Sequence, residues 1–195
     1  MSSKCYDYLA HIGEILEKVK TTQWDSIEKS AKKIAETIAA GHSVYIFGAS
    51  HAGILAQEMF YRTGGLAVVN AILPSEFMLN TRPVTQTSAM ERLEGYPTVI
   101  LNNSDVEKGD MLLLHSVSGR NTAAIEMAIK ASEMGIYTTA ITNMEYSTQV
   151  TSRHSSRKKL YEVCDVVIDN CGDYEDSSML LQGMKQKIAP TSSVV

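Results

Sequence analysis

The chain has 195 residues, of which 44% are hydrophobic and 21% charged, and its net charge is −4. This length and composition are typical of a globular domain with one well-buried core, and the acidic balance argues against nucleic-acid binding through a broad basic surface. The three cysteines are odd in number, which excludes a fully paired disulfide framework, and they lack C-x-x-C spacing, which disfavours a structural zinc site. No metal is expected, and no cofactor is predicted.

The N-terminus lacks the apolar segment of a signal peptide, and no apolar run approaches the ~20 residues that a membrane helix needs. We therefore expect a cytoplasmic protein without a membrane partner. Apolar side chains at intervals of three and four predict helices over residues 4–20 and 26–40. The second helix is predicted to begin at a capping-box-like pair, Asp25 and Glu28, and to end at Gly41.

The first predicted strand, residues 43–48, is a short apolar run with β-branched and aromatic side chains. It breaks at Gly48 into a helix that is predicted to end at the two glycines of residues 64–65. A second strand is predicted over residues 66–72. The next segment is divided by prolines, and its pattern indicates helical turns near 75–79 and 89–93 and a minor strand over 98–101.

The second half of the chain continues this alternation. Strands are predicted over 111–115, 136–142 and 165–169, with a helix that ends at Gly135 between the first two. The polar stretch that follows contains a basic run, residues 153–159, which we interpret as a solvated surface. Strands that alternate with helices are joined by right-handed crossovers. The sequence therefore predicts an α/β fold, one domain over residues 1–195 with a parallel sheet that helices cover on both faces.

Two of these strands end in small, polar, glycine-containing loops that lead into helices. We call residues 48–53 the first loop and residues 116–122 the second loop. The first N–H groups of a helix lack intrahelical partners and carry partial positive charge, so hydroxyl groups and a glycine beside them form a site for an anion, most often phosphate. The candidate ligand contacts are Ser50, His51, Ser116, Ser118, Gly119, Arg120, Asn121 and Thr122.

Each loop also has a simpler interpretation. In the second loop, Ser118 or Asn121 could merely cap the helix that follows. In the first loop, which lacks the G-x-G-x-x-G spacing of a dinucleotide site, small residues could serve only close packing of helix on strand. If the strand order is flavodoxin-like, however, the strands that carry the two loops lie side by side where the order reverses, and one ligand could touch both loops.

The pattern Ser116-x-Ser118-Gly119-x-Asn121-Thr122 after an apolar strand resembles the phosphosugar-binding signature of SIS (sugar isomerase) domains. That superfamily includes phosphoheptose isomerases, N-acetylmuramic acid 6-phosphate etherases and the isomerase half of glucosamine-6-phosphate synthase. Residues 48–65 and 188–195 are similar to an uncharacterised bacterial group of SIS-domain proteins. The resemblance covers nearly the whole chain and implies a three-layer αβα sandwich with a five-stranded parallel sheet, in a homodimer or a dimer of dimers with sites near the subunit interface. The N-terminal helical pair is then expected to pack on the domain or on the dimer partner.

The chain departs from the family pattern in three places. Residues 48–52 read Gly-Ala-Ser-His-Ala, where SIS domains usually have Gly-x-Gly-x-Ser. Relatives generally continue beyond this sequence into a long helix, which we expect this chain to lack; Thr191, Ser192 and Ser193 would lie at its N-terminus as a third possible anion contact. By position, Glu58 falls near the place where phosphoheptose isomerases have a functional His.

Aldose–ketose isomerisation needs a base whose pKa is tuned towards neutrality. Glu58 and His51 are the catalytic candidates, because they lie in or just after the first loop, whereas His115 is expected to be buried against a neighbour. The sequence thus predicts a protein that binds a phosphorylated sugar, as an isomerase or a related enzyme such as a lyase that acts on a sugar or amino-sugar phosphate. The alternatives are a module that binds or senses the same ligand without turnover, and a flavodoxin-like nucleotide or flavin-binding domain.

Overall fold

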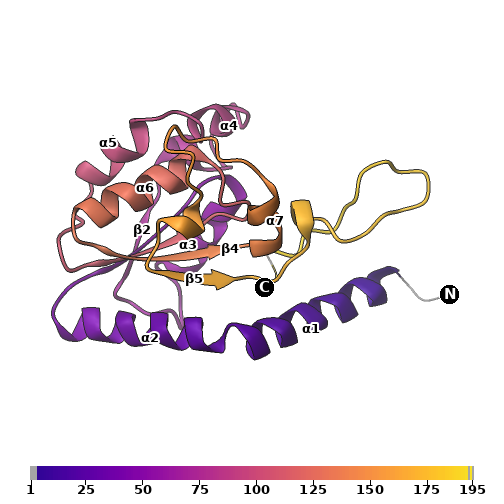
Figure 1. Cartoon of the computed structure of the whole chain (residues 1–195), viewed down its shortest axis with the longest axis horizontal. Coiled ribbons are helices and arrows are strands. Elements are labelled where there is room, and N and C mark those ends of the chain that lie inside the picture. The colour runs from indigo at the N-terminus through magenta and orange to yellow at the C-terminus, as the bar shows by residue number, and fades with distance from the viewer. Residues whose placement is uncertain (1–3, 193, 195) are drawn as a thin grey trace.

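A computed structural model describes residues 4–192 and 194 of the protein (Figure 1). The described residues form a five-stranded, wholly parallel sheet with the strand order β2-β1-β3-β4-β5. This is the predicted flavodoxin-like order, and the predicted α/β fold with two helices before the first strand is confirmed. The strands are β1 (Val44–Gly48), β2 (Val69–Ile72), β3 (Met111–His115), β4 (Tyr137–Thr142) and β5 (Val166–Asp169).

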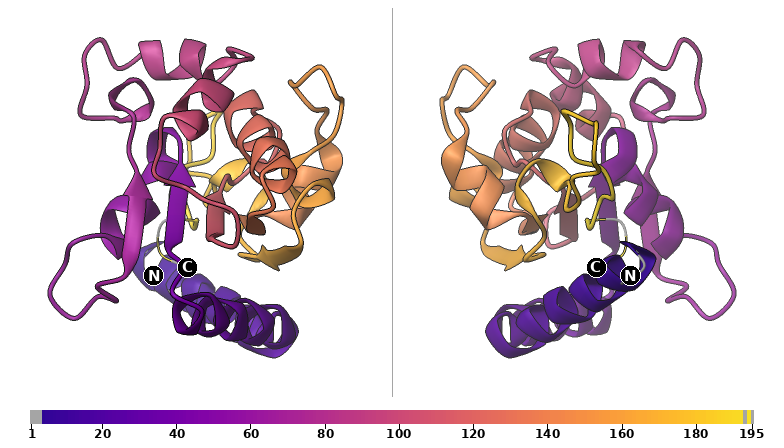
Figure 2. Two further views of the ribbon diagram at one scale, coloured as in Figure 1. Left: turned by 90° about the vertical axis from the view of Figure 1, so that its left-hand side faces the viewer. Right: turned by 90° about the vertical axis from the view of Figure 1, so that its right-hand side faces the viewer.

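Helices cover both faces of the sheet, which is why β1 and β3 are continuous apolar runs and are buried along their whole length. On one face, Val44, Ile46 and Leu113 pack with side chains of α2 (Trp24–Ala39) and α3 (Gly53–Met59). On the other, Phe47, Leu112 and Leu114 pack with α5 (Tyr96–Asn102) and α6 (Thr122–Glu133). Figure 2 shows the N-terminal helices and the magenta helices of the middle segment on opposite sides of the sheet.

The helix α1 (Lys4–Thr22) extends beyond the sheet and lies beside the C-terminal segment (Figure 1). The Tyr8 hydroxyl donates a hydrogen bond to the carbonyl of Pro190, and the His11 imidazole lies 2.8 Å from the carboxylate of Asp173. These contacts fix α1 against residues that follow β5. Other exposed apolar side chains of α1, Tyr6 and Leu9, have no such cover within the described residues.

The predicted minor strand over 98–101 is wrong, because these residues belong to the helix α5. Pro97 lies in its first turn, where a missing N–H costs nothing. The carboxylate of Glu126 on α6 accepts hydrogen bonds from the backbone N–H groups of Gly95 at 2.8 Å and Thr98 at 3.1 Å. A buried carboxylate from another helix therefore supplies the N-terminal cap, which a short apolar run cannot reveal.

Other element boundaries also differ from the prediction. The helix after the first loop ends at Met59 and not at the glycine pair, and α2 begins at Trp24, before the predicted capping box. The helix α7 (Met144–Gln149) overlaps the start of the polar stretch, where the sequence predicts no helix or strand. Asn143 caps α7 by accepting the backbone N–H of Tyr146 at 2.8 Å. The short helix α4 is formed by Gln86–Met90.

Candidate functional site

The two loops meet at the point where the strand order reverses. Gly48 at the end of β1 is paired with His115 at the end of β3, so the first and second loops leave neighbouring strands at the same edge of the sheet. Ligands of doubly wound sheets bind outside this edge, at the switch point. The predicted juxtaposition of the two loops is therefore confirmed.

Residues from a later segment of the chain hold the second loop in place. Gly119 has φ +59, and a Cβ atom there would lie 2.4 Å from the hydroxyl oxygen of Ser147. That hydroxyl donates to the carbonyl of Ser118 at 2.7 Å, and the backbone N–H of Leu160 donates to the carbonyl of Gly119 at 2.8 Å. Glycine is thus required both by the left-handed backbone and by the close approach of α7.

The side chain of Asn121 does not cap the first turn of α6, so the simpler interpretation of this residue as a helix cap is wrong. Asn121 occupies the N-cap position, but its amide donates to the carboxylate of Glu91 and its carbonyl oxygen accepts from Arg153 Nη1 at 2.7 Å. Among the described residues, no side chain caps this helix, and the hydroxyl groups of Ser116 and Ser118 have no hydrogen-bond partner. The two serine hydroxyls therefore remain available to a ligand at the helix N-terminus.

The other polar residues of the second loop bind the protein itself. The buried Thr122 hydroxyl donates to the carbonyl of Arg153 at 3.1 Å, and Arg120 Nε donates to the carbonyl of Thr151 at 3.0 Å. Arg153 belongs to the basic run that we interpret as a solvated surface, yet its backbone N–H, its carbonyl and its guanidinium group all contact the second loop. Its role could not be predicted because its partners lie about thirty residues earlier in the chain.

Positive charge gathers around the N-terminus of α6. Partial burial lowers the pKa of Arg153, and the nearby guanidinium groups of Arg120 and Arg92 lower that pKa further. One carboxylate, Glu91, lies among them, and burial raises its pKa while the Arg153 charge opposes that rise. Three guanidinium groups around one carboxylate leave a net positive field beside the two free serine hydroxyls, which favours an anion.

The first loop has a different structure. It turns into a short 3-10 helix, η1 (Ser50–Ala52), with Ser50 in the left-handed region at φ +60. A Cβ atom on Gly48 would lie 2.4 Å from the carbonyl oxygen of Ala52, and one on Gly53 would lie 2.8 Å from the carbonyl oxygen of Gly48. The glycines of this loop thus serve close packing of its own backbone.

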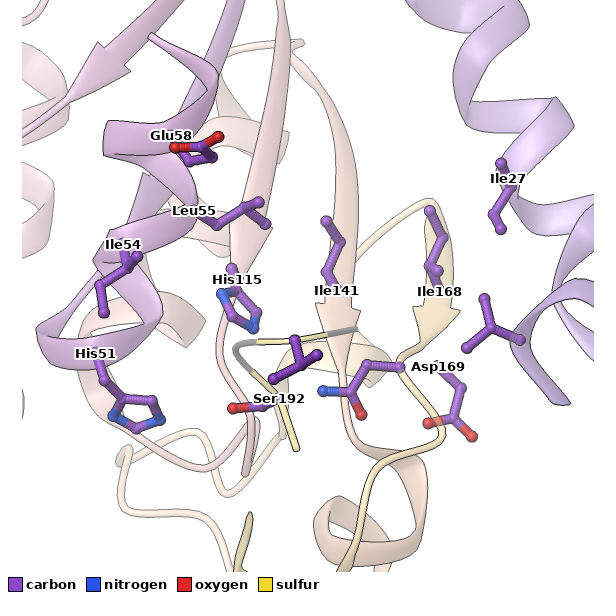
Figure 3. Close-up of a pocket in the computed structure, with 13 residues that line it drawn as sticks. Ile27, His51, Ile54, Leu55, Glu58, His115, Ile141, Ile168, Asp169 and Ser192 are labelled. Atoms are coloured by element: carbon purple, nitrogen blue, oxygen red, sulfur yellow. The ribbon is translucent and has the colours of Figure 1, made fainter. Parts of the chain in front are cut away.

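A cavity of ≈ 330 Å³ opens between α3 and the N-terminal helices, over the ends of β3, β4 and β5 (Figure 3). Its walls are mostly apolar, and the predicted residues His51, Glu58 and Ser192 line it, whereas no residue of the second loop is part of the described lining. Its lining residues are Val19, Ile27, His51, Ile54, Leu55, Glu58, His115, Ile141, Ile168, Asp169, Asn170, Ser192 and Val194.

The remaining predicted residues lie around Asp176 or at the cavity rim. The Asp176 carboxylate accepts the backbone N–H of Thr191 at 3.0 Å and the Ser192 hydroxyl at 2.7 Å, and it lies 3.9 Å from His51 Nε2. Thr191 is fully buried, so it and Ser192 are bound within the protein; Ser193 lies outside the described residues. Glu58 is exposed at the rim and forms an ion pair with Arg62 one turn later on the chain.

Two polar side chains in the cavity were not among the predicted site residues. His115 is 6% exposed, and its Nδ1 lies 3.0 Å from the carbonyl oxygen of Ala52. Asn170 is 5% exposed, and its side-chain nitrogen has no hydrogen-bond partner among the described residues. Their position in the sequence could have indicated both residues, because each lies at or just after the carboxyl end of a predicted strand.

Among the described residues, neither a metal-binding cluster nor a membrane-spanning helix is found. Within residues 4–192 and 194, no group of three or more His, Cys, Asp or Glu side chains is placed to hold a metal ion. Over that same part of the chain, none of the helices has the length and apolar character needed to cross a membrane.

The fold and the site together define a doubly wound α/β domain with two polar, glycine-containing loops at its switch point. The chain belongs to the SIS-domain family, whose family model matches residues 7–143. It is 48% identical to a UPF0309 protein of Oceanobacillus iheyensis over 97% of this chain and 77% of that protein. It is 46% identical to a UPF0309 protein of Shouchella clausii over 96% of this chain and 76% of that protein.

Solved structures with the same fold include two phosphoheptose isomerases. The enzyme from Neisseria gonorrhoeae has a TM-score of 0.62 and 14% identity, over 85% of this chain and 84% of that chain. The enzyme from Francisella tularensis has a TM-score of 0.62 and 15% identity, over 87% of this chain and 85% of that chain. At this level of identity the likeness shows the fold, and the activity has to be argued from the site.

Proposed function

We propose that the protein binds a phosphorylated sugar at the switch point and interconverts its aldose and ketose forms. The observation that carries this proposal is the N-terminus of α6, which has no side-chain cap among the described residues, with the unpartnered hydroxyls of Ser116 and Ser118 beside it. A dianionic phosphate satisfies both the hydroxyl donors and the helix N–H groups, and the surrounding guanidinium groups balance its charge. Membership of the SIS-domain family supports the same ligand class.

The cavity supplies room for the rest of the ligand. Its volume of ≈ 330 Å³ is at the lower end of the range for small-molecule sites, about 300–1,000 Å³. Of the predicted catalytic residues, His51 and Glu58 are placed on its rim, where a sugar bound by its phosphate at the second loop would extend. In this proposal Glu58 and His51 assist proton transfer, Ser50 contacts the ligand from the first loop, and Thr191 and Ser192 shape the cavity through Asp176.

One observation favours a protein that binds the same ligand without turnover. Glu58 is exposed and forms an ion pair with Arg62, so it is a solvated side chain at the cavity rim. A catalytic carboxylate usually has a raised pKa that results from burial or from a nearby like charge. The binding step is common to both functions, and only a turnover measurement separates them.

The proposal includes a homodimer, which is also the assembly that the family resemblance implies. The exposed apolar side chains of Tyr6, Leu9 and Leu16 on α1 form a surface that a second copy of the chain would cover. Sedimentation of the purified protein tests this part independently of the ligand. A monomer at micromolar concentration would contradict it.

Thermal-shift titrations with a panel of hexose, hexosamine and heptose phosphates test the binding step, with the unphosphorylated sugars and FMN as comparisons. We expect stabilisation by at least one sugar phosphate and by none of the free sugars. Ser118→Ala should weaken the binding of that sugar phosphate by about 1–3 kcal/mol, since a buried contact to phosphate is lost. Ser132→Ala, at the exposed far end of the same helix, is the matched control.

Two results would contradict the proposed ligand. Stabilisation by FMN alone would indicate a flavin site at the same edge of the sheet. Equal affinity of the Ser118→Ala protein and its Ser132→Ala control would place the phosphate away from the second loop.

A further inference from the structure

His115 is an imidazole in a position where a core strand would ordinarily have an aliphatic side chain. It follows Met111 and Leu113 on the same face of β3, and those two residues pack beneath α2 and α3. The imidazole is 6% exposed and lines the cavity, with His51 and Ser192 at the same end (Figure 3). A buried polar ring carries a desolvation cost that an aliphatic residue would avoid, so its presence calls for a chemical reason.

The hydrogen bond of His115 fixes its tautomer. Nδ1 lies 3.0 Å from the carbonyl oxygen of Ala52, and a carbonyl can only accept, so Nδ1 carries the proton. In a neutral imidazole this leaves Nε2 as an unprotonated nitrogen with a free lone pair. Among the described residues, no group hydrogen-bonds to Nε2. The cavity therefore contains one oriented nitrogen base.

The surroundings keep this ring neutral at physiological pH. Burial is the main cause that lowers the pKa of His115, and a positive charge on His51 lowers it further, while the Ala52 carbonyl and Asp176 oppose the shift. Two other carboxylates line the cavity, Glu58 on α3 and Asp169 at the end of β5. A base that is neutral near pH 7 and close to anionic groups can accept a proton and hold it briefly as an imidazolium ion.

We propose that Nε2 of His115 is the catalytic base that moves the proton between the two carbons of the sugar phosphate. The proposal rests on the proposed function and names a residue for its chemical step. The second loop begins at Ser116, directly after His115, so a ligand with its phosphate on that loop has its remaining carbons within reach of the cavity. The carboxylate of Asp176, which already accepts the Ser192 hydroxyl, favours the imidazolium ion through its negative charge.

The step balances without an oxidant or a cofactor. Nε2 takes the proton from the hydroxyl-bearing carbon next to the carbonyl group; the electron pair of that C–H bond forms a C=C double bond, and the carbonyl oxygen takes a proton from a solvent water molecule, which leaves hydroxide. The resulting enediol then collapses: its other hydroxyl group gives its proton to that hydroxide and becomes the new carbonyl group, and the former carbonyl carbon takes the proton back from Nε2. One carbon is oxidised and its neighbour is reduced, so the net reaction is an isomerisation.

The decisive variant is His115→Asn. The amide nitrogen of asparagine takes the place of Nδ1 and can still donate to the Ala52 carbonyl, but no base stands where Nε2 was. We measure, by NMR in deuterium oxide, the exchange of the carbon-bound proton of whichever panel sugar phosphate stabilises the wild-type protein. The exchange rate should fall by about 100- to 10,000-fold, while the thermal shift at saturating ligand stays within about two-fold of wild type.

Two controls separate this role from a structural one. His42→Asn changes a partly exposed histidine near Gly109, at the opposite end of the sheet, and should exchange at the wild-type rate. The pH profile of the wild-type exchange rate should stay level through neutral pH and fall only in acid, below the ordinary histidine pKa of 6.5, because the pKa of His115 is lowered. A ring that served only packing would give no such acid limb.

Failure of this inference is distinguishable from failure of the proposed function. If no sugar phosphate stabilises the wild-type protein, the proposed ligand itself is wrong. If a sugar phosphate binds but the wild-type protein does not exchange its proton, or if the His115→Asn protein exchanges at the wild-type rate, His115 is not the base. Loss of exchange in Glu58→Gln with full exchange in His115→Asn would assign the step to the rim carboxylate.

Discussion

The first and second loops leave adjacent strands at one edge of the sheet but are built in opposite ways. The second loop is fixed from outside, by Ser147, Leu160, Glu91 and Arg153, and it keeps its two serine hydroxyls free. The first loop is packed on itself through its glycines and opens onto the cavity. The loop with the clearest sequence signature thus has free hydroxyls at a helix N-terminus, where we propose that an anion binds, whereas the loop with the weaker signature borders the cavity.

The proposed binding motif and the proposed catalytic groups therefore depend on different parts of the fold. An anion site at a helix N-terminus is local, because the backbone N–H groups and the hydroxyls come from one short segment. The cavity is assembled from the N-terminal helices, from three strand ends, from α3 and from the C-terminal segment (Figure 3). Its polar groups come together only when the whole sheet is formed.

The largest effect that would test this contrast is expected at Gly119 of the second loop. Gly119→Ala adds a Cβ atom 2.4 Å from the Ser147 hydroxyl at a residue with φ +59. We expect a loss of about 2–4 kcal/mol in the free energy of unfolding, from the left-handed backbone and the overpacking together. Urea denaturation measures it. Gly41→Ala, at φ +81 with nothing within 4 Å, is the control and should lose only about 1 kcal/mol.

An intermediate effect is expected at Asn121. Asn121→Ala removes the hydrogen bonds to Glu91 and Arg153 and leaves a partly buried carboxylate without its amide donor. The free energy of unfolding should fall by about 1–2 kcal/mol, and the affinity for the sugar phosphate should also fall because the second loop loosens. Asn102→Ala, at an exposed position of α5, should change stability by no more than about 0.5 kcal/mol. Equal losses in the two variants would show that the second loop is not fixed by this network.

The smallest effect is expected in the pH dependence of stability, where His115 in the cavity and His11 on the N-terminal helix act in opposite directions. Folding lowers the pKa of His115, mainly through burial. Below pH 6.5 the unfolded chain therefore binds a proton at this residue that the folded chain does not bind, so the free energy of unfolding decreases as the pH decreases. The pKa of His11 is raised, mainly by its hydrogen bond to Asp173, so its contribution is present below pH 6.5 and is lost as pH rises through the folded pKa. In thermal melts between pH 5 and 8, His115→Asn should flatten the acid loss and His11→Asn should steepen it.

A reversed order of these two slopes would mean that the buried imidazole is charged in the fold. That result would also remove the neutral base from the cavity. The pH melts therefore check the electrostatics of the cavity without any ligand.

The alternation of strands and helices, the parallel order and the position of the second loop were all determined by the sequence alone. Buried parallel strands are continuous apolar runs, and glycine marks the turns that follow them, so both signals are local. The chemical pattern of the second loop is likewise contained in seven consecutive residues. The fold that the family resemblance implies agrees with these patterns.

Tertiary structure alone decided the features that depend on partners distant in the chain. Glu126 caps a helix whose residues the sequence pattern predicts to be a strand. Arg153 donates a hydrogen bond to Asn121, although the sequence pattern predicts that its segment is a solvated surface. The Ala52 carbonyl, 63 positions from His115, decides which nitrogen of that ring is a base. Each case depends on one specific hydrogen bond formed on folding, and a pattern of residue types along the chain does not encode the direction of such a bond.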